Sequence, residues 1–100
     1  MEYTKKEKIL ESIDSKKDFI LCFSSDWCGP CKAMGPMLEQ IDTELGGNSV
    51  YKVNVDKEPE LSQKYGIRSI PTLIFFKDGV ETEKIVGATS KKFIMNALNS

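Results

Sequence analysis

The sequence contains no histidine, which removes several kinds of chemistry at once. Without an imidazole there is no Ser-His or Cys-His nucleophile pair, no histidine metal ligand, and no side chain that ordinarily titrates near neutral pH. An excess of charge of one sign is also missing, because 14 basic residues stand against 15 acidic ones for a formal net charge of −1. No net field is available to hold a phosphate backbone or an anionic membrane, so we expect no nucleic-acid partner.

Long hydrophobic runs are absent as well. The longest, at residues 19–23, has the length of a strand, far short of the ~20 residues of a membrane helix, so we expect no membrane contact. The first residues enter a polar helical pattern without the apolar core of a signal peptide, which makes the cytoplasm the expected location. One hundred residues suffice for one core, and we interpret residues 1–100 as a single domain and expect a monomer.

Cysteine is scarce, with three residues at positions 22, 28 and 31. An odd number without an export signal argues against a structural disulfide framework and for thiol chemistry or metal binding. A zinc site needs four ligands, whereas one of these cysteines falls in a buried run and no histidine completes the set, so we expect no metal. No glycine-rich nucleotide loop is present, and no bound cofactor is expected.

Apolar periodicity and turn residues predict alternating helices and strands. Helices are predicted over about residues 4–15, 28–45, 59–65 and 90–98, and strands over residues 19–23, 50–55, 72–76 and 80–86. Thr4 and Glu7 form a capping-box pattern at the first helix, and Asp78-Gly79 is a two-residue hairpin signal. The last helix carries Phe93, Ile94, Ala97 and Leu98 on one apolar face. This order predicts an α/β fold with a central mixed sheet and helices on both faces.

The informative stretch is residues 27–32, Trp-Cys-Gly-Pro-Cys-Lys, between a buried strand and a helix. Two cysteines two residues apart can close a small disulfide ring, and the Gly-Pro pair between them allows the tight turn. The unpaired N–H groups and partial positive charge of a helix N-terminus favour thiolate over thiol. Cys28 is therefore predicted to be the exposed, attacking thiolate, and Cys31 the more buried thiol that attacks second. A purely structural pair is the less favoured alternative.

This hexapeptide resembles the active-site signature of the thioredoxins, and further matches run in register over roughly residues 17 to 98. They are Pro36, Lys52, Asp56, Ile70-Pro71-Thr72 and residues 65–68, 76–79 and 86–88. The resemblance implies the thioredoxin fold, a central mixed sheet of four to five strands flanked by four helices. It also implies a protein-disulfide reductase that acts on disulfide-containing proteins, maintains redox homeostasis and is recycled by a thioredoxin reductase.

The resemblance further implies a site around the two cysteines. Pro71 is expected to carry a cis bond and pack against the cysteine pair, the alternative being a trans proline that only delays the strand. Side chains expected to support the active site are Trp27, Gly29, Pro30, Lys32, Lys52 and Pro71. An extended substrate segment is expected to lie in a groove lined by Trp27, Gly29, Pro30, Ile70, Pro71, Val86, Gly87 and Ala88. The alternative is core packing for Trp27 and ordinary strand packing for Ile70 and Val86.

The sequence departs from the family at three places. Only about three residues precede the first predicted helix, so the family's first edge strand is expected to be truncated or missing. The tryptophan common three residues before the motif tryptophan is Ser24 here, which removes packing behind the active-site loop. The family's buried aspartate is Cys22, which we expect to be a core residue rather than a third redox thiol. Lys52, its partner in the family, either extends its ammonium to water or favours the Cys28 thiolate.

Two rival functions share this fold. A binding or scaffold protein would keep the cysteine pair but work by docking to one partner, and a specialised thioredoxin would serve one reductase or one target. Reduction of insulin with dithiothreitol as electron source separates the reductase from the binding protein.

Overall fold

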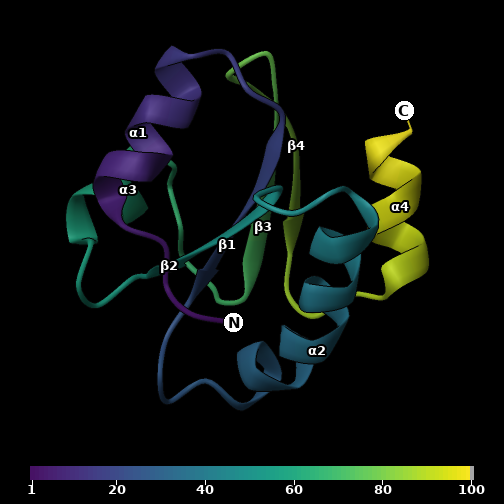
Figure 1. Ribbon diagram of the computed structural model, residues 1–100. Coiled ribbons are helices and arrows are strands. Elements are labelled where there is room, and N and C mark those ends of the chain that lie inside the picture. Colours follow the sequence, from purple (N-terminus) through teal and green to yellow (C-terminus); the bar gives the residue numbers. More distant parts are fainter. Residues whose placement is uncertain (100) are drawn as a thin grey trace.

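A computed structural model describes residues 1–99, in which one mixed sheet carries helices on both faces (Figure 1). The strands β1 (Phe19–Ser24), β2 (Val50–Asn54), β3 (Thr72–Lys77) and β4 (Val80–Val86) lie in the order β2-β1-β3-β4. β1 pairs in parallel with β2 and antiparallel with β3, and β3 pairs antiparallel with β4. The helices are α1 (Lys6–Asp14), α2 (Gly29–Glu44), α3 (Pro59–Lys64) and α4 (Lys91–Leu98). The predicted α/β class and element order are confirmed.

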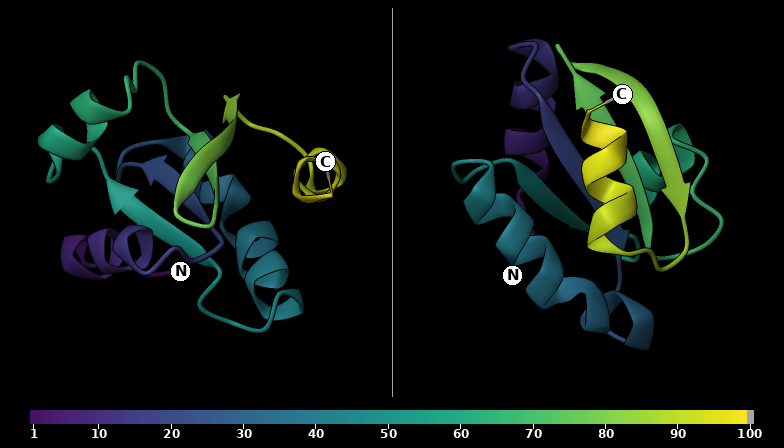
Figure 2. Two further views of the ribbon diagram at one scale, coloured as in Figure 1. Left: turned by 90° about the horizontal axis from the view of Figure 1, so that it is seen from above. Right: turned by 90° about the vertical axis from the view of Figure 1, so that its right-hand side faces the viewer.

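The sheet separates two apolar cores, and Figure 2 shows the helices on its two sides. α1 and α3 contribute Ile9 and Leu61 to one core, whereas α2 and α4 contribute residues such as Met34 and Ile94 to the other. β1 supplies both, because successive side chains of a strand point to opposite faces. Its six residues are all buried. A strand covered on both faces needs a continuous apolar run, which explains the pattern in the sequence.

The helix that follows the cysteine motif, α2, is placed by its apolar spacing. Met34, Leu38 and Ile41 are buried at i, i+4 and i+7, and Pro36 lies inside the helix as predicted. The helix ends before Gly46 and Gly47, whose φ angles of 97° and 86° suit glycine and stop the helical path. The N-terminus of α2 follows β1 after a short loop.

The β3–β4 hairpin closes the sheet at the end opposite the cysteine motif. Asp78 and Gly79 both have positive φ, 55° and 77°, as a two-residue hairpin loop requires. The backbone N–H of Gly79 donates to the carbonyl oxygen of Lys17, at 3.0 Å. A Cβ at Gly79 would collide with the carbonyl oxygen of Ile13 in α1. Glycine is therefore required here both by its conformation and by the close approach of another backbone.

The predicted capping box at Thr4 is wrong. α1 begins at Lys6, with Lys5 at the N-cap and no side-chain cap hydrogen bond. Thr4 instead faces β2: its N–H donates to the Lys52 carbonyl at 2.6 Å, and its Oγ1 accepts from the Lys52 N–H at 3.1 Å. Unpaired backbone groups on an edge strand need partners, and β2 draws Thr4 away from the helix. In residues 1–99 no strand precedes α1, so the expected edge strand is missing.

Candidate active site

The two cysteines of the motif lie at the start of α2, after the loop that follows β1. They are joined by a disulfide with a Cα–Cα distance of 5.3 Å. Cys28 is the N-cap residue of α2, with extended backbone angles, and its Sγ accepts a hydrogen bond from the Cys31 N–H at 3.2 Å. One of the unpaired N–H groups of the helix N-terminus is therefore aimed at the Cys28 sulfur. In the reduced protein the same donor and the helix dipole stabilise negative charge on that atom.

The expected difference in exposure between the two cysteines is not found. Cys28 is 5% exposed and Cys31 4%, so both are buried in this oxidised form. What distinguishes Cys28 is its position at the helix cap rather than its exposure.

Trp27 is a surface residue, which excludes core packing. Its side chain is 72% exposed, and its indole Nε1 donates to Asp56 Oδ2 at 2.9 Å. Asp56 follows β2, where its backbone N–H donates to the Asn54 side chain at 2.8 Å. The ring is thus oriented from the loop after β2 while its apolar surface remains open beside the cysteines.

The predicted groove residues of β3 and β4 are brought together at the same end of the sheet. The Ile70–Pro71 bond is cis, as the resemblance implied. The Pro71 carbonyl accepts from the Gly87 N–H at 2.8 Å, which ties this loop to the end of β4. Thr72 pairs with Phe23 on one side and Val86 on the other, so all three strands reach the end of the sheet that leads into α2. Pro71 is buried and Ile70 partly so, whereas Val86 is 61% exposed.

Cys22 is a core thiol and does not join the disulfide. It is 2% exposed and packs in the same apolar cluster as Met34 of α2. Burial raises its pKa to about 12, although the positive charge of Lys52 on the neighbouring strand acts in the opposite direction. The thiol therefore stays protonated at neutral pH. The prediction of a packing role is consistent with each of these observations.

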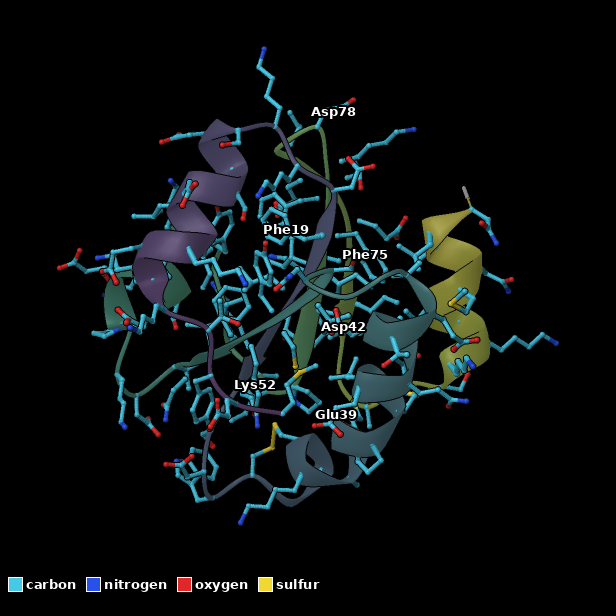
Figure 3. The ribbon with its side chains drawn as sticks, viewed as in Figure 1. Phe19, Glu39, Asp42, Lys52, Phe75 and Asp78 are labelled. Atoms are coloured by element: carbon cyan, nitrogen blue, oxygen red, sulfur yellow. A yellow bond between two sulfur atoms is a disulfide. The ribbon has the colours of Figure 1, made fainter. Side chains whose placement is uncertain are left out.

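The Lys52 side chain makes a contact that neither of the two alternatives considered from the sequence includes. Its ammonium nitrogen lies 4.6 Å from the ring centroid of Tyr3, in a cation–π contact. In Figure 3 Lys52 is labelled in the lower half of the molecule, away from Asp78 at the hairpin. Tyr3 in turn donates its hydroxyl to Asp26 Oδ1 at 2.7 Å. Asp26 stands two residues before Cys28, so Lys52 is linked to the active-site loop through an aromatic ring.

Sequence reasoning missed three residues near the site. No short-range signal connects Tyr3 with Asp26, because they are 23 positions apart. The sequence predicts Phe93 on the apolar face of α4, but its side chain is 66% exposed, whereas Ile94 beside it is fully buried. Phe93 lies at the margin of the helical stripe, and with Ala88, Thr89 and Ser90 it lines a shallow hollow next to the groove residues. Gly29, Pro30 and Lys32 are exposed around the cysteines.

No group of three or more histidine, cysteine, aspartate or glutamate side chains within residues 1–99 is arranged to hold a metal ion. The reactive groups of this end of the molecule are therefore two sulfurs, one indole and the surrounding charged side chains.

Comparison with known proteins places these features in context. A family model described as Thioredoxin matches residues 1–100. A thioredoxin of Chlorobaculum thiosulfatiphilum is 38% identical over 99 residues, covering 98% of this chain and 92% of that protein. A thioredoxin of Chlamydia caviae is 41% identical over 80 residues, covering 80% of this chain and 78% of that protein. Among solved structures, Malassezia sympodialis thioredoxin has a TM-score of 0.80 at 34% identity, covering 95% of this chain and 87% of that one. Oxidised mitochondrial thioredoxin 3 of Saccharomyces cerevisiae has a TM-score of 0.83 at 26% identity, covering 94% and 89%.

Proposed function

The chain belongs to the thioredoxin family of thiol–disulfide oxidoreductases, and we propose from that premise that Cys28 is the attacking thiolate and Cys31 the resolving thiol. Its activity is protein-disulfide reduction by dithiol–disulfide exchange through the Cys28–Cys31 pair. The observation that supports the assignment of roles is the hydrogen bond from the Cys31 N–H to the Cys28 Sγ at the start of α2.

The exchange proceeds in two steps. The Cys28 thiolate attacks one sulfur of the target disulfide, forming a mixed disulfide and releasing the other target sulfur as a thiolate that takes up a proton. Cys31 then loses its proton and attacks the Cys28 sulfur, which releases the second target thiol and leaves the Cys28–Cys31 disulfide. Two electrons pass from the cysteine pair to the target. The structure has the oxidised product of this sequence.

The substrate groove is the second part of the proposal. Trp27 and Val86 offer exposed apolar surface, and the hydrogen bond from the Gly87 N–H to the Pro71 carbonyl holds the Ile70–Pro71 segment beside the end of β4. Gly29, Pro30, Gly87 and Ala88 leave space for a backbone, since none of them carries a large side chain. An extended segment on either side of a target cysteine fits such a surface, with Pro71 packed against the cysteine pair and Lys32 beside it.

The partners follow from the reaction. Proteins of this family act on disulfide substrates and are generally reduced by a thioredoxin reductase, and we propose such a reductase as the electron donor here. Within residues 1–99 no helix combines the length and apolar character that crossing a membrane demands. We further propose the cytoplasm as the site of action, because a reductant of this kind operates where thiols are kept reduced. We propose a monomer as the working form, because one chain supplies both cysteines of the reactive pair.

Trapping experiments test the assignment of the two thiols. Cys31→Ser should accumulate stable mixed disulfides with target proteins, because no resolving thiolate remains, whereas Cys28→Ser should trap none. Both variants should lose insulin reduction, and Cys22→Ala, the matched control for removal of a cysteine, should keep it within a few-fold. Stronger trapping by Cys28→Ser would reverse the roles. An inactive parent protein would instead favour a protein that works by docking.

A further inference from the structure

The loop that enters the active site, residues 25–27, is held by two hydrogen bonds from outside. The indole of Trp27 donates to Asp56, and the carboxylate of Asp26 accepts from the hydroxyl of Tyr3. Asp56 belongs to the loop after β2, but Tyr3 comes from the segment before α1. Two separate parts of the chain therefore fix consecutive residues of the loop that ends at the attacking sulfur.

Tyr3 has a second contact that makes its position specific. Its ring makes a cation–π contact with the Lys52 ammonium, whose nitrogen lies 4.6 Å from the ring centroid. The backbone of the next residue, Thr4, exchanges two hydrogen bonds with Lys52 itself, at 2.6 and 3.1 Å. Tyr3 is thus anchored on the same residue that its ring contacts, and its hydroxyl is directed to Asp26 from that anchor.

The surroundings of the Tyr3 hydroxyl keep it a hydrogen-bond donor. Burial and the hydrogen bond to Asp26 raise the pKa of Tyr3 to about 12, while the Ser24 hydroxyl acts in the opposite direction. Ser24 is 1% exposed and is the small residue that occupies the place of the family's tryptophan. Tyr3 therefore brings an aromatic ring to the region behind the loop where the local sequence supplies only a serine.

We propose that Tyr3 is a positioning residue for disulfide exchange: its ring holds the Lys52 ammonium and its hydroxyl holds Asp26 in the loop before Cys28. The inference rests on the proposed role of Cys28 as the attacking thiolate. Lys52 on β2 lies opposite Cys22 on β1, and β1 is the strand that leads into this loop. A neutral ring restrains the ammonium without cancelling its charge, and the donated hydroxyl disperses the negative charge of the nearby carboxylate. Both effects favour a thiolate at Cys28.

The sign of the effect on the redox equilibrium follows. Stabilising the reduced thiolate makes the disulfide a stronger oxidant. Tyr3→Leu releases the ammonium to water and leaves Asp26 without its donor, so the potential of the Cys28–Cys31 couple should become more negative. We expect a threefold to tenfold change in the exchange equilibrium constant, which corresponds to ~15–30 mV for a two-electron couple.

Conservative and matched variants separate the contacts. Tyr3→Phe keeps the ring over Lys52 and loses only the hydroxyl, so its shift should be smaller than that of Tyr3→Leu. Lys52→Met should shift the potential in the same direction. Lys64→Met is the matched control: it also removes one lysine that lies over a tyrosine ring, with its nitrogen 5.7 Å from the Tyr65 centroid. That control should leave the potential unchanged.

Trp27 provides a direct readout of the loop, because it is the one tryptophan in the sequence. Tyr3→Leu should speed the anisotropy decay of its fluorescence, while circular dichroism confirms that the fold is kept. A shift under twofold in the exchange equilibrium with unchanged anisotropy would overturn the proposal, and so would a shift to a less negative potential. If Lys64→Met shifted the redox potential as much as Lys52→Met does, the effect of Lys52→Met would come from net charge alone, which would also contradict the proposal.

Failure of the proposed function has a different signature. Potential and anisotropy are measured on the disulfide and the loop themselves, so they test Tyr3 whether or not the parent protein reduces insulin. An inactive parent with a Tyr3-dependent potential would contradict the reductase assignment but support the positioning role. An active parent that is indifferent to Tyr3→Leu would do the reverse.

Discussion

Alkylation of the oxidised protein isolates Cys22, because the other two cysteines are joined in a disulfide. The pKa of about 12 leaves only about 10⁻⁴ of this thiol ionised at pH 8, whereas an ordinary cysteine with a pKa of about 8.5 is about one quarter ionised. The thiolate population is therefore lower by roughly 2,000-fold. A more basic thiolate is also a better nucleophile, and with a Brønsted slope of about 0.45 this returns roughly 40-fold. The net expectation is labelling about 60-fold slower than that of an ordinary thiol, before steric burial slows it further.

The assay is the rate of iodoacetamide incorporation into the folded, oxidised protein between pH 7 and 10. Because the whole range lies below the pKa of Cys22, the rate should rise about tenfold per pH unit without levelling. The oxidised Cys22→Ala variant should show no incorporation, and unfolding in guanidinium chloride should restore an ordinary rate. A rate within tenfold of the unfolded protein, or a plateau below pH 10, would refute the argument that burial controls this thiol.

Three further results are expected. Gly79→Ala should lower the free energy of unfolding by ~2–4 kcal/mol in urea titrations, because φ is 77° and a backbone carbonyl oxygen of α1 occupies the space of the new methyl group. Phe93→Ala should change stability by less than ~0.5 kcal/mol, whereas Ile94→Ala should cost ~2–4 kcal/mol, since only the second side chain is buried. Stability should fall as pH rises above about 8.5, because the unfolded chain ionises Cys22 before the folded protein does, and Cys22→Ala should flatten that decline in alkaline unfolding curves.

The parts of the fold that the sequence predicts well are those fixed by local chemistry. Gly46-Gly47 ends a helix and Asp78-Gly79 closes a hairpin because few other residues adopt positive φ, and both occur as predicted. Ser90 caps α4 through its side chain, which accepts from the Phe93 N–H. The cysteine motif belongs to the same class, since a helix N-terminus after a buried strand can be read from neighbouring residues.

The failures arise where a distant partner competes with a local one. Thr4 has the right spacing to cap a helix, but the open edge of β2 offers it two hydrogen bonds to Lys52, 48 positions away. For the Lys52 ammonium the sequence predicts either water or the Cys28 thiolate as the partner, because it gives no sign of the contact with Tyr3. Phe93 shows the complementary error: an apolar residue at the margin of a helical stripe is not buried when no second layer covers that side.

The active site also depends both on neighbouring residues and on contacts between residues far apart in the sequence. The order Cys-Gly-Pro-Cys at a helix start determines which bonds form and break, and it is contained in four consecutive residues. Lys52 on β2 and Asp26 after β1 are brought together differently, because both contact Tyr3 in the first residues of the chain. A carboxylate in place of Cys22 would cancel the lysine charge, whereas an aromatic ring only restrains it. The proposed role of Tyr3 therefore implies that proteins with one motif can differ in redox potential through residues that no motif contains, and that the N-terminal segment makes that difference in this chain.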